Sequence, residues 1–142
     1  MPIKPIPDGT STVIPYFLAA DAAGLIEFLK QVFAAQEKHR TEMPNGKVMH
    51  AHLRIGDSSV MLGQAPPGKA PMSAMIYTYV DDVDAVYKRA IAAGATSINE
   101  PADQFYGDRV GAVTDPAGNQ WWIATHKEDV SEEEIARRAP KR

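Results

Sequence analysis

The sequence of 142 residues predicts an α+β fold built from two βαβββ modules, each with one helix and a sheet of four strands. Three observations predict this fold. The order strand, helix, three strands occurs twice along the chain. An aspartate precedes each predicted helix, and Asp82 lies 61 positions after Asp21. A stretch rich in Pro and Gly, APPGKAP at 65–71, separates the two occurrences.

The first module begins with an apolar strand at 12–19, where Pro15 indicates a sheet edge or a bulge. Asp21 is a suitable N-cap for a helix over 22–34, because apolar residues recur there at helical spacing. These residues are Ala22, Leu25, Ile26, Leu29, Val32 and Phe33. Three more strands are predicted at 36–43, 48–55 and 59–64. The Asn-Gly pair in PNGK, 44–47, predicts a hairpin turn before the second of them.

The second module repeats this order. A strand at 74–80 leads to a helix that is capped by Asp82 and ended by Gly94, with Val83, Val86, Ala90 and Ile91 as its apolar stripe. A weak strand at 95–99 is followed by a hairpin of strands 109–114 and 119–125 around DPAG. We expect one domain over 1–142, with module one at 11–65, a linker at 66–72, module two at 73–126 and a tail at 127–142. In the tail, Ser131 and Glu134 form a capping box, which predicts one or two helical turns.

Composition excludes several classes of function. The net charge of −3, without a basic block before the last few residues, argues against nucleic-acid binding. The absence of cysteine excludes disulfides, thiolate metal sites and a Cys nucleophile, and it suits a cytoplasmic location. No apolar run approaches the ~20 residues that span a bilayer, and the first residues do not resemble a signal peptide. No phosphate-cradling glycine motif is present.

The adjacent pair Trp121 and Trp122 lies in the last predicted strand. Neighbouring side chains of a strand point to opposite faces, and an indole is costly to expose. We therefore expect one of the two indoles to enter a core, which leaves open what the other one faces.

Two stretches, FLAADAAGLIEFLKQVF and GDRVGAVTDPAGNQWWIATH, resemble the vicinal oxygen chelate superfamily. This superfamily includes glyoxalase I, extradiol dioxygenases, fosfomycin-resistance enzymes and bleomycin-resistance proteins. The resemblance covers 11–126 and is closest to the bleomycin-resistance-like, PhnB-like branch. It implies the glyoxalase/bleomycin resistance fold, in which paired βαβββ modules form a U-shaped cleft of eight strands. It also implies a homodimer.

In the metal-dependent members of that superfamily, the first, fourth, fifth and eighth strands each supply one ligand, usually His or Glu. Carried over to this sequence, the four positions are Ile14, Leu62, Met75 and Trp122. None of these side chains suits a divalent metal. The resemblance therefore implies a site without metal, cofactor or catalytic residue. It also implies that Trp122 faces the cleft and that Trp121 enters the helix-packed core.

Alternation along 48–55 places an apolar face under the first helix, formed by Met49, Ala51, Leu53 and Ile55. His50, His52 and Arg54 then share the opposite face. The Cα atoms of His50 and His52 are expected about 6.6–6.8 Å apart. This spacing suits a grip on a metal or an anion, and equally two hydrogen-bonded histidines beside a cleft. His39 is expected at the surface.

Aromatic and thioether side chains are expected to line the rest of the cleft. Met75, Tyr77 and Tyr79 share one face of their strand, and Tyr16 follows Ile14 on the first strand. Arg109 has two interpretations: it clamps a bound anion, or it pairs with Asp108, Asp115 or Glu128 to hold the hairpin. The predicted ligand-binding residues are Tyr16, His50, His52, Met75, Tyr77, Tyr79, Arg109 and Trp122.

Three functions remain open from the sequence. The first is metal-free binding of an aromatic or cationic small molecule, because aromatic walls suit such ligands. The second is a metal-dependent lyase or dioxygenase that uses His50 and His52. The third is an interaction module whose cleft is only a core. The expected partners are a small-molecule ligand and a second copy of the chain, with no nucleic acid and no membrane.

Overall fold

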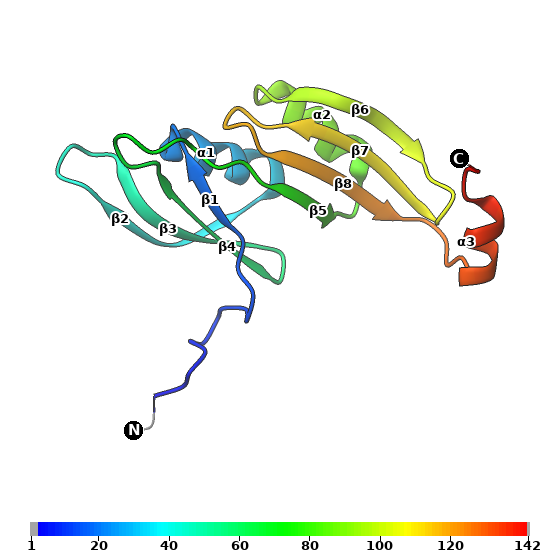
Figure 1. The fold of residues 1–142 in the computed structure, drawn as a ribbon, viewed down its shortest axis with the longest axis horizontal. Helices are drawn as coiled ribbons and strands as arrows, with labels where there is room; N and C mark the ends of the chain where they lie inside the picture. The colour runs from blue at the N-terminus through cyan, green and yellow to red at the C-terminus, as the bar shows by residue number, and fades with distance from the viewer. Residues whose placement is uncertain (1–2, 142) are drawn as a thin grey trace. The chain divides into compact units, whose positions relative to one another are not determined.

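The computed structural model describes residues 3–141, and this part of the chain contains eight strands and three helices (Figure 1). In chain order the elements are β1 (Tyr16–Ala19), α1 (Ala22–Phe33), β2 (Gln36–Glu42), β3 (Val48–Ile55), β4 (Ser58–Gln64), β5 (Met75–Tyr79), α2 (Val83–Ala92), β6 (Thr96–Asp103), β7 (Asp108–Thr114), β8 (Gln120–His126) and α3 (Glu132–Arg138).

The chain divides into two compact units, and the boundary lies between Ala74 and Met75, just after the Pro- and Gly-rich stretch. The first unit holds a sheet with the strand order β1-β4-β3-β2, and the second holds a sheet with the order β5-β8-β7-β6. In each sheet the first strand runs parallel to its neighbour and the other pairs are antiparallel. These sheets and helices confirm the predicted α+β fold of two βαβββ modules.

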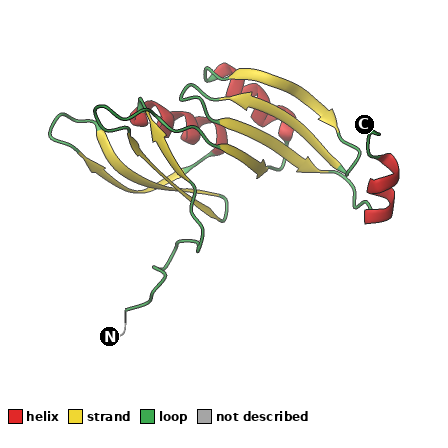
Figure 2. Ribbon diagram, viewed as in Figure 1, coloured by secondary structure: helices red, strands yellow, loops and turns green. Residues whose placement is uncertain are grey.

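Each of the two longer helices covers one face of its own sheet (Figure 2). In the first unit α1 packs on β1, β3 and β4, and in the second α2 packs on β6, β7 and β8. Within residues 3–141, the contacts of α1 and α2 lie on one face of each sheet only, and we call the other face the open face. Alternation along the strands therefore decides which side chains enter the helix-packed core and which reach the open face.

Both predicted N-caps are confirmed. The carboxylate of Asp21 accepts a hydrogen bond from the backbone N–H of Gly24, and that of Asp82 accepts one from Ala85. Helix α2 buries a narrower stripe than expected, because Ile91, near its end, is 38% exposed. In the tail, the hydroxyl of Ser131 caps α3 as predicted.

The turn between β7 and β8 explains the burial of Trp121, which is 1% exposed. Buried Asp115 accepts hydrogen bonds from the backbone N–H groups of Ala117 and Asn119. Its second oxygen accepts one from the indole N–H of Trp121 at 2.8 Å. The DPAG turn thus supplies the acceptor that a buried indole needs, and the prediction that Trp121 enters the core is confirmed.

The first strand is shorter than predicted. The sequence predicts a strand over 12–19, whereas β1 begins at Tyr16. Ile14 and Pro15 precede it, and the carbonyl of Pro15 still accepts a hydrogen bond from Met61. Proline lacks a backbone N–H, so the regular ladder begins only after it.

Strand β3 also departs from the predicted alternation. Met49 was expected under the first helix, but it is 53% exposed, and Val48 is buried instead. The ladder explains this exchange: Thr41 pairs with His50 and Glu42 pairs with Val48, so Met49 has no partner in β2. One extra residue in a strand forms a β-bulge and reverses the alternation beyond it. Period-two counting could not detect it.

No helix in residues 3–141 is long and apolar enough to cross a membrane.

Candidate ligand-binding site

The open face of the second sheet carries most of the predicted aromatic residues. Tyr77 of β5 lies directly beside Trp122 of β8 in the parallel register. Met75 and Tyr79 lie on the same face as Tyr77, two residues before and after it, and all three are exposed. Trp122 is half-buried, and its side chain lies opposite to that of Trp121. The structure thus brings these four predicted residues together on one face.

A cavity of about 390 Å³ opens beside Trp122 within the second unit. Its wall combines the aromatic rings of Trp122 and Tyr106 with the apolar side chain of Val110. Its polar and small lining residues are Asn99, Glu100, Ala102 and Gln104. Glu100 is the one ionisable carboxylate in this lining. A wall with two aromatic rings and one carboxylate suits a flat or cationic group.

The face also contains a hydrogen-bonded cluster that sequence reasoning did not identify as a site. Its centre is Asp108, which is only 4% exposed. One oxygen of Asp108 accepts hydrogen bonds from the hydroxyls of Tyr77, at 2.6 Å, and Tyr79, at 2.8 Å. The other oxygen lies 2.8 Å from Nδ1 of His126, and Nε2 of His126 lies 2.7 Å from Asp129. We call these five residues the Asp108 cluster.

The cluster shifts the pKa values of its members. Burial by itself would raise the pKa of Asp108, but hydrogen bonds from Tyr77, His126 and Tyr79 outweigh it and lower that pKa. The pKa of His126 is raised mainly by its hydrogen bond to Asp108, and the hydrogen bond to Asp129 raises it further. Burial and the hydrogen bond to Asp108 raise the pKa of Tyr77. The carboxylate therefore stays ionised and the phenols stay neutral at ordinary pH.

The cluster fixes what the tyrosines offer to a ligand. Both hydroxyls are already used by Asp108, and the two rings meet edge to face with centroids 5.5 Å apart. A ligand on this face would thus contact the rings of Tyr77 and Tyr79 in fixed orientations, with the buried negative charge of Asp108 behind them. The available signal in the sequence was the pairing of Asp108 with His126 across the last hairpin, because directly opposed residues interact.

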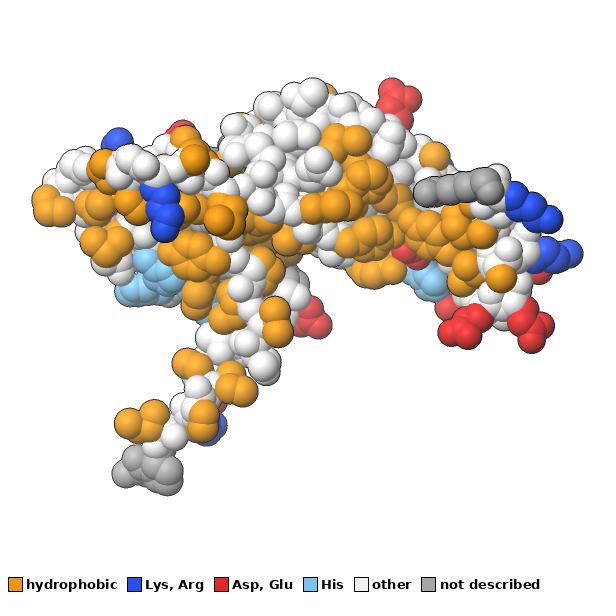
Figure 3. All heavy atoms as spheres, in the orientation of Figure 1, with side chains coloured by type: hydrophobic (Ala, Val, Ile, Leu, Met, Phe, Trp, Pro, Cys, Tyr) orange, Lys and Arg blue, Asp and Glu red, His pale blue; other side chains and the backbone are white. Residues whose placement is uncertain are grey.

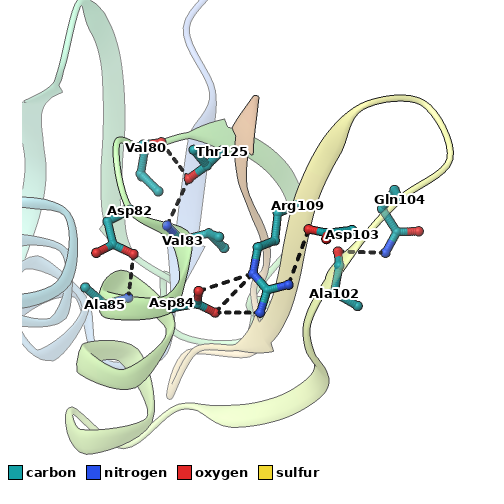
Figure 4. Close-up of polar contacts among 10 residues, drawn as sticks. All are labelled: Val80, Asp82, Val83, Asp84, Ala85, Ala102, Asp103, Gln104, Arg109 and Thr125. Carbon is teal, nitrogen blue, oxygen red and sulfur yellow. Dashed lines mark hydrogen bonds and ion pairs between the residues drawn. The ribbon is translucent and has the colours of Figure 1, made fainter. Parts of the chain in front are cut away.

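Arg109 does not join this cluster, because it binds acidic residues of α2 and β6 instead (Figure 4). Its guanidinium donates to the carboxylate of Asp84, near the start of α2, and to Asp103 of β6. It thus reaches the helix-covered side of the sheet and ties α2 to β6. The geometry favours the structural interpretation of Arg109, although the partners are not those considered from the sequence.

The open face of the first sheet gathers Tyr16 and the histidines. The hydroxyl of Tyr16 lies 3.2 Å from Nδ1 of His50, and the two rings stack with centroids 5.7 Å apart. His52 lies two residues further along β3, on the same face, and its register partner in β2 is His39. Gly63 permits the Tyr16 contact, because a Cβ there would come 2.9 Å from the Tyr16 hydroxyl and would also collide with the Met49 carbonyl.

The residues present do not fit the metal implied by the metal-dependent members. The position carried over to Leu62 is wrong, because Leu62 is fully buried on the helix-covered side of its strand, and its neighbours Met61 and Gly63 have the opposite orientation. Ile14 has no donor atom, and Met75 and Trp122 offer no hard ligand. Residues 3–141 contain no group of three or more His, Cys, Asp or Glu side chains that could hold a metal ion.

Comparison with known proteins agrees with the fold. The family model described as Glyoxalase/Bleomycin resistance protein/Dioxygenase superfamily matches residues 15–123, most of the chain. The chain belongs to this superfamily. The resemblance noted from the sequence is thereby confirmed at the level of the superfamily, whose members share the paired-module fold.

Two relatives with clear sequence similarity to this chain are named as uncharacterized proteins. Mb0911c of Mycobacterium bovis is 39% identical over 132 residues, which cover 85% of this chain and 87% of the relative. Rv0887c of Mycobacterium tuberculosis is 39% identical over the same length, covering 85% and 78%. Neither name states an activity.

Solved structures share the fold at lower identity. TioX from Micromonospora sp. ML1 has a TM-score of 0.69 and 24% identity, covering 82% of this chain and 98% of TioX. The fosfomycin resistance protein FosX from Mesorhizobium loti has a TM-score of 0.62 and 18% identity, covering 89% and 97%. At these identities the likeness establishes the fold alone.

Proposed function

We propose that this superfamily member binds an aromatic or cationic small molecule without a metal ion, on the open face of its second sheet. The observation that carries the proposal is the position of Trp122, half-buried beside a cavity of about 390 Å³. Cavities of this size suit small molecules, and aromatic walls give flat ligands a large contact area.

Charge supports the cationic part of the proposal. Glu100 lies in the cavity lining, and the ionised carboxylate of Asp108 lies behind the rings of Tyr77 and Tyr79. A cation above an aromatic ring is attracted by the ring itself, and a nearby negative charge adds to this attraction.

Binding of this kind needs no reacting group. Sequestration in the style of the bleomycin-resistance proteins requires affinity alone. Tyr77 and Tyr79 suit this role, because their hydroxyls are bonded to Asp108 and their rings are fixed as contact surfaces. The alternative of a metal-dependent lyase or dioxygenase would need more ligands than His50 and His52, since catalytic metal sites usually have three. The alternative of an interaction module leaves the cavity beside Trp122 without a role.

Fluorescence tests the proposal, because the protein carries one indole at the cavity and one in the core. We would titrate the protein with benzylammonium, benzyl alcohol and cyclohexylammonium, which separate aromaticity from charge. We expect saturable quenching, strongest with benzylammonium. Trp122→Phe should abolish the signal change, since the remaining indole, Trp121, is buried.

Matched variants refine the result. Glu100→Gln should weaken benzylammonium and leave benzyl alcohol unchanged. The same substitution at Glu132, an exposed residue of α3, serves as the control. Quenching that does not saturate, or that is equal in the wild type and Trp122→Phe, would remove the basis of the proposal.

A further inference from the structure

We propose that the open face of the first sheet binds a small oxyanion, a carboxylate or a phosphate, between His39, His50 and His52. The inference rests on the first unit alone. It holds whether or not the second unit binds an aromatic or cationic molecule.

Three imidazoles meet on this face from two adjacent strands. His39 of β2 is the direct register partner of His52 of β3. Its ring also approaches that of His50, with centroids 6.3 Å apart. The bulge between Glu37 and His39 in the ladder turns His39 to this face. Figure 3 shows the result as a pale-blue histidine patch on the exposed surface over the first sheet.

Two of the rings are oriented by neighbours. The hydroxyl of Tyr16 holds His50 through Nδ1, and the hydroxyl of Thr41 lies 2.9 Å from Nε2 of His39. Each of these rings keeps its other nitrogen outside those contacts. The face therefore offers several N–H donors on side chains that are already oriented, which reduces the ordering cost of binding.

His52 supplies the observation that points to a ligand. Its Nε2 is the buried side-chain nitrogen or oxygen that lacks a hydrogen-bond partner within residues 3–141. Buried polar atoms are nearly always bonded, and each exception calls for a missing partner such as a ligand or an ion. An oxyanion that accepts from Nε2–H would satisfy this atom.

The charges around His52 decide which kind of partner fits. Burial is the main cause that lowers the pKa of His52, and neighbouring basic groups lower it further. Those neighbours come from both strands: Lys38 of β2 and Arg54 of β3 are cations, and His39 and His50 contribute when they are protonated. Tyr16 of β1 adds a neutral hydroxyl, and β4 contributes Met61, the register partner of both Tyr16 and His52.

The nearest carboxylates of β2 are occupied on the helix-covered side. Glu37 bonds to Arg40 and lies 3.0 Å from Lys30 of α1, and Arg40 also approaches Glu42. The field at His52 is therefore positive, which repels a metal cation and attracts an anion. Protonating an imidazole strengthens the site, so anion binding and proton uptake are linked.

Histidine NMR titration tests the inference with an internal reference. The four imidazole Hε1 signals of the intact protein are followed from pH 5 to 8 in sodium phosphate, sodium acetate, or sodium chloride at equal ionic strength. We expect the apparent pKa of His52 and at least one neighbour to rise by about one unit when the anion is near ten times its Kd for the protonated form. His126 lies in the second unit and is bonded to two carboxylates, so its signal should not respond.

Phosphate and acetate distinguish the two possible kinds of ligand. A response to phosphate alone indicates a phosphoryl group, and an equal response to acetate indicates a carboxylate. His52→Gln should at least halve the response of His50 and His39. Lys47→Gln, which removes an exposed positive charge at the hairpin of the same unit, should leave it unchanged. Identical titrations in phosphate, acetate and chloride would overturn the inference. Stoichiometric binding of zinc or nickel at these histidines would overturn it as well.

Discussion

Tyr77 donates a 2.6 Å hydrogen bond to Asp108, and so an exposed ring is anchored to a buried carboxylate. Tyr79 and His126 complete the coordination of the same acid. A buried charge persists only when it is paired and hydrogen-bonded. Here its partners are the same side chains that form the candidate ligand-binding face, so the stability and the shape of that face depend on one residue.

The first prediction is that Asp108→Asn destabilises the protein. Hydrogen bonds to a charged group contribute about 1.5–3 kcal/mol, and an amide cannot accept from both tyrosines and from His126 with equal strength. We therefore expect a loss of that order in the free energy of unfolding, measured from urea midpoints at pH 7. Asp57→Asn, at an exposed aspartate in the turn before β4, is the control. Equal midpoints for the two variants would show that the Asp108 cluster contributes little.

The second prediction concerns pH. The pKa of His126 is raised in the folded state by Asp108 and Asp129. Its contribution to stability is therefore complete below the unfolded value of about 6.5 and is lost as pH rises through the folded value. Unfolding midpoints should fall across this window in the wild type and stay flatter in His126→Gln. An NMR pKa of His126 at or below its unfolded value would contradict the assignment.

The third prediction compares the two adjacent tryptophans. Trp121→Ala removes a buried indole that bonds to Asp115, and it should cost about 3–5 kcal/mol. Trp122→Ala should cost clearly less, because this side chain is half-buried and donates only to exposed Gln120. Urea midpoints of both variants measure the difference. The reverse order would mean that the faces of β8 are exchanged.

The fourth prediction is that divalent metals do not stabilise the protein. The four positions implied by the metal-dependent members, Ile14, Leu62, Met75 and Trp122, provide no suitable donors. A specific ligand at 100 times its Kd adds about 2.7 kcal/mol, which is easily visible as a rise in Tm. Thermal unfolding with nickel, zinc, manganese or iron should show no such rise. A rise that disappears in a variant lacking both His50 and His52 would favour the enzyme alternative.

The fifth prediction is a symmetric homodimer. Strand β5 is an edge of its sheet within the second unit, and its exposed Met75 and Tyr79 add apolar surface to an unpaired edge. The unpaired backbone N–H and C=O groups of an edge strand can form hydrogen bonds with a second copy of the chain. Light scattering at micromolar concentration should give twice the mass of the chain. A monomer under these conditions would contradict the prediction.

Much of the architecture was predictable because local chemistry dictates it. Asp21 and Asp82 cap their helices through their own side chains, and the DPAG turn requires the residues it has. Alternation placed Trp121 and Trp122 on opposite faces of their strand, and the resemblance to the superfamily indicated which of the two enters the core. These features depend on neighbours within a few positions, which a sequence displays directly.

The Asp108 cluster was not predictable in the same way. Asp108 and Tyr77 are 31 positions apart and meet only because β5 and β7 both flank β8. The sequence suggests three acidic partners for Arg109, but its actual partners, Asp84 and Asp103, come from a helix and a different strand. Charged side chains are long and choose among several neighbours, so spacing does not identify their partners.

The extra residue of β3, Met49, restricts which side chain β4 can carry at position 63. The carbonyl of Met49, the residue without a partner in β2, occupies the space that a Cβ at position 63 would need. Deleting Met49 would leave Thr41 opposite His50 and Glu42 opposite Val48 in an uninterrupted ladder, with every face preserved. The backbone obstacle at residue 63 would then disappear, and only the Tyr16 hydroxyl would have to move to admit alanine. Among homologous chains, a one-residue deletion here and the loss of this glycine should therefore occur together.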